Sequence, residues 1–135
     1  LEFNQNIFFD GQIYDAYSFV NDLIKLAKSE IVLIDNYIDD TVFTLFSKYP
    51  NINFTIYTST ISKQLKLDFE KYSKQYKNIS LKTFKSSHDR FLIIDKKEIY
   101  HLGASLKDLG KKWFAFSKMS LNSLNLDDIL HKLEV

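Results

Sequence analysis

The sequence predicts an α/β domain with a mixed, largely parallel sheet and helices on both of its faces. In the first half, short apolar runs alternate with amphipathic stretches, which is typical of parallel strands joined by helices. In the second half, two apolar runs flank Lys96-Lys97, which indicates an antiparallel hairpin. The chain has 135 residues, 45% of them hydrophobic, with 1 Pro and 3 Gly. We therefore expect one compact domain over residues 1–135, without a flexible linker.

The first half is expected to begin with a strand that ends at the turn signal Asp10-Gly11. Apolar residues at three- and four-residue steps then predict a helix from Tyr14 onward. The continuous run Ile31–Ile34 is typical of a strand buried on both faces. The expected elements are, in order, a strand at 7–9, a helix at 14–27, a strand at 31–34, a helix at 41–49, a strand at 54–57 and a helix at 61–76.

The second half is expected to contain more strands and a final helix. The strands are predicted at 80–84, 91–95, 98–102 and 113–119. We interpret Phe114, Phe116 and Met119 as core residues of the last strand. Asn125 is a suitable N-cap for a terminal helix. That helix would turn four apolar side chains inward: Leu126, Ile129, Leu130 and Leu133.

Polar side chains follow two of the predicted strands. Because parallel strands joined by right-handed crossovers end at the same sheet edge, the residues after Ile34 and Tyr57 should lie together, where α/β proteins bind ligands. Asp39 and Asp40 are interpreted as loop charges and helix caps rather than cation ligands. The candidates for the pocket rim are Asp35, Asn36, Tyr37, Thr58, Ser59 and Thr60.

His88 and Arg90 could carry out chemistry on phosphate. Side chains alternate along a strand, so these two would share one face. A neutral imidazole can attack phosphorus, and a guanidinium can hold phosphate oxygens and offset developing negative charge. Asp95 could orient a histidine ring through a hydrogen bond. The alternative is that His88 is an ordinary surface or structural histidine.

The spacing His88-x-Arg90-x-x-x-x-Asp95 resembles the H-x-K-x-x-x-x-D motif of the phospholipase D superfamily. Gly103-Ala104-Ser105-Leu106 resembles that family's G-S-x-N segment. The resemblance implies that His88 forms a phosphohistidine or protonates the leaving oxygen, that Arg90 clamps phosphate and that Asp95 supports a histidine. We also expect Ser105, Lys107 and Tyr37 to contact phosphate.

A closer resemblance joins nearly the whole chain to the C-terminal phospholipase-D-like region of phage-type regulators. It rests on three stretches: Phe9–Tyr17, Ile34–Asp40 and His88–Met119. In those regulators a KilA-N-related or Roi-antirepressor-type DNA-binding domain precedes this region. The resemblance implies that such a domain precedes Leu1, that nucleic acid is a partner, and that the chain is an excised piece of a longer protein. The superfamily uses two motifs, and a homodimer could supply the second across its two-fold axis.

Charge, Cys content and hydropathy exclude several classes of function. The formal net charge is +1, so an anion site must come from local clustering. Cys is absent, which is compatible with the cytoplasm expected for this protein. No run of roughly 18 apolar residues predicts a membrane span. The resemblance implies a metal-independent phosphodiesterase or nuclease, so we expect neither a metal nor a cofactor.

Two departures from the superfamily pattern leave a second hypothesis open. Arg90 replaces the family's Lys, and Leu106 replaces its Asn. The alternative function is therefore a degenerate, non-catalytic phosphate-binding or dimerisation module. Binding to anionic lipid is a third hypothesis, which the near-neutral charge disfavours. A basic-aromatic cluster of Lys107, Lys111 and Lys112 with Trp113 could hold phosphate or stack on a base, although a core position is also expected for that Trp.

Overall fold

The computed structural model describes residues 5–9, 11–109, 111, 113–119 and 123–133. Its strands and helices alternate through the first half of the chain, as predicted. The elements are β1 (Gln5–Phe8), α1 (Ile13–Lys25), β2 (Glu30–Ile34), α2 (Asp40–Ser47), β3 (Asn53–Thr58), α3 (Lys63–Ser73), β4 (Ile79–Thr83), β5 (Arg90–Ile94), β6 (Glu98–Leu102), the 3-10 turn η1 (Leu106–Asp108), β7 (Phe114–Lys118) and α4 (Ser123–Leu133).

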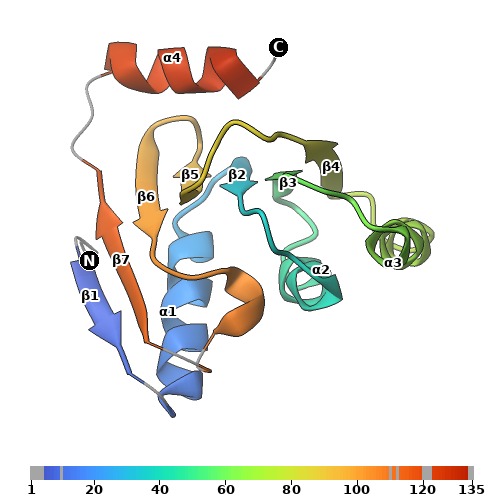
Figure 1. Cartoon of the computed structure of the whole chain (residues 1–135), viewed down its shortest axis with the longest axis horizontal. Coiled ribbons are helices and arrows are strands. Elements are labelled where there is room, and N and C mark those ends of the chain that lie inside the picture. Colours follow the sequence, from blue (N-terminus) through green and yellow to red (C-terminus); the bar gives the residue numbers. More distant parts are fainter. Residues whose placement is uncertain (1–4, 10, 110, 112, 120–122, 134–135) are drawn as a thin grey trace.

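The strands form one mixed sheet in the order β1-β7-β6-β5-β2-β3-β4. The β2–β3 and β3–β4 pairs are parallel, and the other described pairs are antiparallel. The mixed sheet was predicted correctly, but the prediction that it is largely parallel was wrong. The reason is that β5 inserts antiparallel beside β2 and brings the β5–β6 hairpin into the centre of the sheet (Figure 1).

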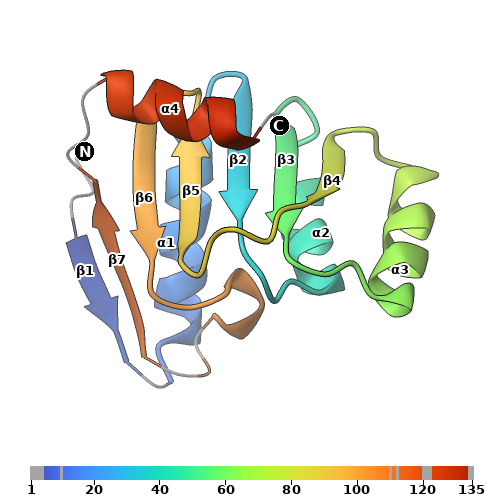
Figure 2. The same cartoon turned by 45° about the horizontal axis from the view of Figure 1, so that its top comes forward.

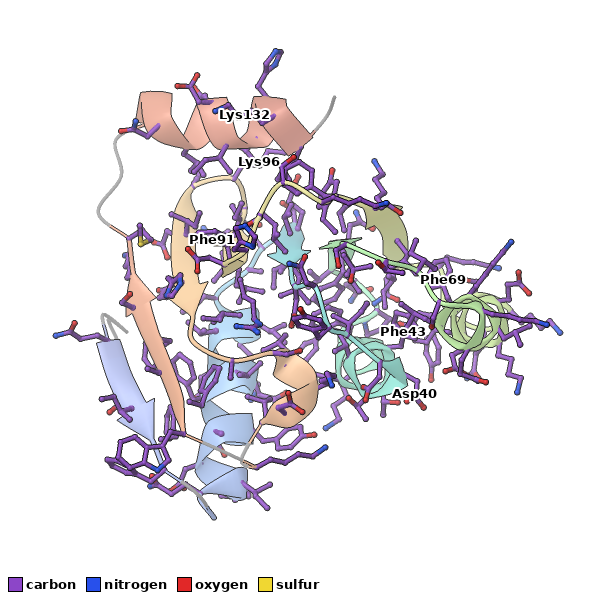
Figure 3. All side chains as sticks on the ribbon, in the orientation of Figure 1. Asp40, Phe43, Phe69, Phe91, Lys96 and Lys132 are labelled. Atoms are coloured by element: carbon purple, nitrogen blue, oxygen red, sulfur yellow. The ribbon has the colours of Figure 1, made fainter. Side chains whose placement is uncertain are left out.

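Helices cover both faces of the sheet, as predicted (Figure 2). On one face, α1, α2 and α3 contribute to the larger apolar core, which includes Leu23, Phe46 and Leu65. On the other face, Leu126 and Leu133 of α4 pack on a smaller core. Figure 3 shows Phe43 of α2 and Phe69 of α3 pointing toward each other, with ring centroids 5.6 Å apart. Within the described residues, no helix is both long and apolar enough to cross a bilayer.

Three local predictions need correction or confirmation. Asn125 lies inside α4, which begins at Ser123, so it does not cap that helix. Met119 is 37% exposed rather than a core residue, whereas Phe114 and Phe116 are buried as predicted. Asp39 does cap α2, because its side chain accepts a hydrogen bond from the Thr41 N–H.

The β5–β6 hairpin turns through two residues with left-handed backbone. Asp95 has φ 52° and Lys96 has φ 56°. The Asp95 carboxylate accepts hydrogen bonds from the backbone N–H groups of Lys28, Ser29 and Glu30, at 2.8, 2.9 and 3.0 Å. It therefore fixes the hairpin to the segment that enters β2.

The strain at Lys96 leads to a stability prediction. Left-handed backbone costs a residue with a Cβ about 1 kcal/mol, and glycine avoids this cost. Lys96→Gly should therefore raise the free energy of unfolding by about 1 kcal/mol in urea denaturation. The half-exposed Lys96–Glu30 ion pair, 3.9 Å long, contributes little. Lys97→Gly is the matched control and should lower stability, because Lys97 has no positive φ to relieve. A loss of stability in Lys96→Gly would contradict the prediction.

Candidate functional site

Three polar side chains form a row at one edge of the sheet. Asp35 directly follows β2, Thr58 ends β3 and Arg90 begins β5. Ile34 lies opposite Tyr57 on one side and Phe91 on the other, so the next row of residues is Thr58, Asp35 and Arg90. All three continue the face that α1 and α2 cover, because alternate residues share a face. The predicted meeting of the segments after Ile34 and Tyr57 is thus confirmed.

Asp35 is the buried centre of this row, with no exposed surface. Its Oδ2 accepts hydrogen bonds from the Ser105 hydroxyl at 2.9 Å and from the Leu106 N–H at 3.0 Å. Its Oδ1 accepts from the Tyr37 N–H at 3.2 Å. Burial raises the pKa of Asp35 above its ordinary value, although these hydrogen bonds and the charge of Arg90 act in the opposite direction.

Arg90 lies between this carboxylate and the surface. Its Nε is 3.7 Å from Asp35 Oδ1, which is an ion-pair distance but too long for a hydrogen bond. Its guanidinium carbon lies 6.0 Å from the centre of the Tyr37 ring. The Arg90 side chain keeps 25% of its surface exposed. Asp35 and Tyr37 therefore hold a guanidinium that solvent still reaches.

Buried polar atoms without a hydrogen-bond partner gather at the same edge. Those found in the described part of the chain are Asn36 Oδ1, Thr58 Oγ1 and Arg90 Nε. Native proteins satisfy most buried polar atoms, because each unsatisfied one costs about 1–3 kcal/mol. Clusters of buried polar atoms without partners occur at binding sites, where a ligand can supply the missing hydrogen bonds. This edge is therefore the best candidate for a site that contacts a polar ligand.

His88 lies in the exposed segment just before β5. This segment is joined to the end of β2 by a hydrogen bond from Asn36 Nδ2 to the Ser87 carbonyl oxygen, at 2.8 Å. Because β5 begins only at Arg90, the strand alternation that would place His88 on the same face does not extend to it. No described residue hydrogen-bonds the His88 side chain. His88 is thus an accessible imidazole two residues from Arg90.

The other predicted phosphate contacts take different positions. Ser105 is 2% exposed and its hydroxyl donates to Asp35, so direct contact of Ser105 with phosphate does not fit this geometry. Tyr37 is 62% exposed beside Arg90. Lys107 Nζ lies 3.8 Å from an Asp108 carboxylate oxygen, with a third of its side chain exposed.

Asp95 does not make its expected contact with a histidine. It follows the far end of β5 from His88 and Arg90, and its carboxylate binds the backbone that enters β2. His101 of β6 pairs with Phe91, whereas Arg90 pairs with the buried Leu102. His101 therefore points to the opposite face of the sheet from Arg90.

The sequence named Asp35 as a rim residue but missed its pairing with Arg90. The available signal was a carboxylate directly after a fully apolar strand, where a buried charge needs a cationic or hydrogen-bonding partner. Which cation meets it depends on β5 lying beside β2, and that pairing is set by long-range contacts.

No protein-family model matches this chain, and no curated protein matches it. Solved structures do. TrmBL2, an archaeal chromatin protein whose structure shows a novel mode of DNA binding, matches 98% of this chain with TM-score 0.62 and 14% identity. NucT from Helicobacter pylori matches 97% with TM-score 0.61 and 15% identity. Polyphosphate kinase from Porphyromonas gingivalis matches 99% with TM-score 0.58 and 12% identity.

The matched chains differ in size. This chain spans 50% of the TrmBL2 chain, 95% of the NucT chain and 22% of the polyphosphate kinase chain. At these identities the likeness is one of fold. The chain has the mixed α/β, phospholipase-D-like fold that its sequence predicted.

Proposed function

We propose that this chain is a nuclease-type, phospholipase-D-like domain that binds phosphodiesters of nucleic acid at Arg90 and attacks them with His88. The observation that carries the proposal is the Asp35–Arg90 pair. A buried carboxylate holds a partly exposed guanidinium whose Nε has no hydrogen-bond partner. A positioned guanidinium can form paired hydrogen bonds with phosphate oxygens.

Three further features support this reading. The exposed His88 lies close enough in sequence to act on a phosphate that Arg90 holds. Tyr37 is exposed beside Arg90 and could contact the same ligand. TrmBL2, which shares the fold, is described as binding DNA. In the proposed reaction, His88 attacks phosphorus, the oxygen of one ester leaves with a proton, and water then releases the phosphohistidine.

The proposal includes a homodimer, which would bring a second His88 to the same phosphate as the acid for the leaving oxygen. It also includes the role of C-terminal module in a cytoplasmic, phage-related regulator, with a DNA-binding domain ahead of Leu1. Both parts rest on the sequence resemblance.

Cleavage is tested by incubating the purified chain with labelled single-stranded and duplex DNA in EDTA. We expect metal-independent cleavage by the wild type and none by His88→Ala. His131→Ala is the matched control, because His131 is exposed on α4, across the sheet from Arg90. Cleavage that survives His88→Ala, or disappears equally in His131→Ala, would contradict the proposed nucleophile.

Binding is tested separately by fluorescence anisotropy with labelled DNA. Arg90→Ala should weaken binding by roughly tenfold and should reduce the slope of log affinity against log salt by about 1, because one phosphate contact is lost. Lys25→Ala, on the exposed surface of α1, is the charge-matched control and should keep the wild-type slope. Equal affinity of Arg90→Ala and wild type would exclude Arg90 as the phosphate contact.

The second candidate function is a non-catalytic phosphate-binding or dimerisation module. It is favoured by the positions of Asp95 and Ser105, because neither side chain supports His88. In that case Arg90→Ala weakens DNA binding, while no verified dimer of the wild type cleaves any phosphodiester. Measurable turnover that depends on His88 would exclude this candidate.

A further inference from the structure

Helix α4 covers only part of its face of the sheet. The described core residues beneath α4 come from β2, β3, β5 and β6, among them Val32, Tyr57 and Ile99. Figure 2 shows α4 lying across one end of β6, β5 and β2, with β1 and β7 beside it rather than beneath it. On β1 the outward residue Ile7 is 49% exposed, and Phe9 just after it is 47% exposed. An open surface therefore runs over β1, β7 and β6.

This surface is hollowed into a groove of about 730 Å³. Its lining includes Ile7, Phe9 and Ala115, which are apolar, and a polar row of Gln5, Ser117 and His101. The row follows from the register, because Ser117 pairs with Gln5 on one side and with His101 on the other. No Asp or Glu is among the described residues that line the groove.

Two aromatic rings stand at the end of the groove. Phe9 lines it, and Trp113 contacts Phe9 edge to face with ring centroids 4.7 Å apart. Trp113 is 65% exposed, so the alternative that it is a core residue is wrong. Exposed rings beside amide, hydroxyl and imidazole groups suit nucleobases, which stack on aromatic faces and form hydrogen bonds along their edges.

The groove lies on the opposite face of the sheet from Arg90, and the two come near each other at the sheet edge around Asp89. His101 Nε2 lies 3.6 Å from a carboxylate oxygen of Asp89, which stands between His88 and Arg90 in the chain. Gly103 lines the groove and is two residues from Ser105, which Asp35 binds. A strand whose phosphates contact Arg90 would pass around the sheet edge at Asp89 to place its bases in the groove.

We propose that this groove binds unpaired bases of a single-stranded nucleic acid whose backbone lies at His88 and Arg90. The proposal rests on the proposed function and names its substrate class. A duplex would not fit, because its bases are stacked and paired inside the helix and cannot reach Phe9 and Trp113. The described lining has neither carboxylates nor Lys or Arg, so its amide, hydroxyl and imidazole groups suit the neutral edges of bases better than a basic peptide.

Trp113 is the only Trp in the chain and serves as its own reporter. We expect a single-stranded DNA oligonucleotide to quench its fluorescence, and the same sequence as a duplex to leave it unchanged. In anisotropy measurements, Phe9→Ala and Trp113→Ala should each weaken single-strand binding by roughly tenfold, the loss of one stacked base, with duplex binding unaltered. Leu67→Ala is the control, since Leu67 is a 44% exposed apolar residue on α3 at the other end of the sheet. Circular dichroism verifies that each variant is folded.

Each other outcome is informative. Equal binding of single strands and duplex, with neither aromatic variant affected but Arg90→Ala still weakened, would overturn the base site and leave the proposed function standing. If Phe9→Ala instead disrupts a dimer in analytical ultracentrifugation without changing DNA affinity, the groove is a self-association surface and the proposal is wrong. If no DNA of either kind binds, both proposals fail.

Discussion

Replacing Asp35 with Ala should lower the free energy of unfolding by about 3 kcal/mol in total, because the partly exposed Arg90 loses its buried counter-ion. Three hydrogen bonds are lost as well, from the Ser105 hydroxyl and from the Leu106 and Tyr37 N–H groups. Urea denaturation followed by circular dichroism measures the change. A loss below about 1 kcal/mol would mean that solvent, not Asp35, satisfies Arg90.

The matched control is Asp22→Ala. Asp22 is an exposed carboxylate on α1, so its removal should change stability by less than about 0.5 kcal/mol. If both variants lose the same stability, the effect of Asp35→Ala reflects the loss of a negative charge in general. The contrast therefore isolates the contribution of the buried position.

Replacing Asp95 with Asn should lower the free energy of unfolding at pH 7 by about 2 kcal/mol. Burial is the largest single influence and raises the pKa of the Asp95 carboxyl. Hydrogen bonds from the Glu30, Lys28 and Ser29 N–H groups and from the Ser29 hydroxyl together outweigh it and lower the pKa to about 2. The ordinary value is 3.8, and each unit corresponds to about 1.4 kcal/mol. The carboxylate is partly exposed, so solvent screening reduces the stabilisation that this shift implies.

The pH dependence follows from the sign of this shift. Because the pKa of Asp95 is lowered on folding, its stabilisation is complete above about pH 4 and is lost as the pH falls toward 2. The raised pKa of Asp35 acts in the opposite direction and favours folding at low pH. Asp35 is present in both proteins, so its contribution cancels in the difference in unfolding free energy between wild type and Asp95→Asn. We expect this gap to close as the pH falls from about 4 to 2. A gap that stays constant down to pH 2 would contradict the assignment.

Local patterns predicted the elements well. Ile31–Ile34 is a continuous apolar run because β2 is buried on both faces, and β5 and β6 flank Lys96-Lys97 as expected. The neighbours of each strand could not be predicted in the same way. Nothing in the local sequence of β5 specifies that it pairs antiparallel with β2, since that choice depends on contacts between distant segments.

Only part of the site could be predicted from the sequence, for the same reason. Asp35 and Arg90 were each named as candidates, yet their contact depends on the β2–β5 register. The position of Asp95 could have been anticipated. A strand rises about 3.3 Å per residue, so five residues place Asp95 about 16 Å along the chain from Arg90. A carboxylate at that distance cannot orient a histidine next to Arg90, and it was free to bind the Lys28–Glu30 backbone.

The insertion of β5 beside β2 also bears on how the chain folds. Ile31 pairs with Ile94, and the segment between them contains α2, β3, α3 and β4. The parallel β2–β3–β4 unit can form early from nearby residues, but its edge at β2 stays unpaired until β5 arrives. Closing such a long loop is entropically costly and slows folding relative to helical domains. During synthesis, the exposed edge of β2 is therefore the segment most open to wrong strand pairing until residue 94 has emerged.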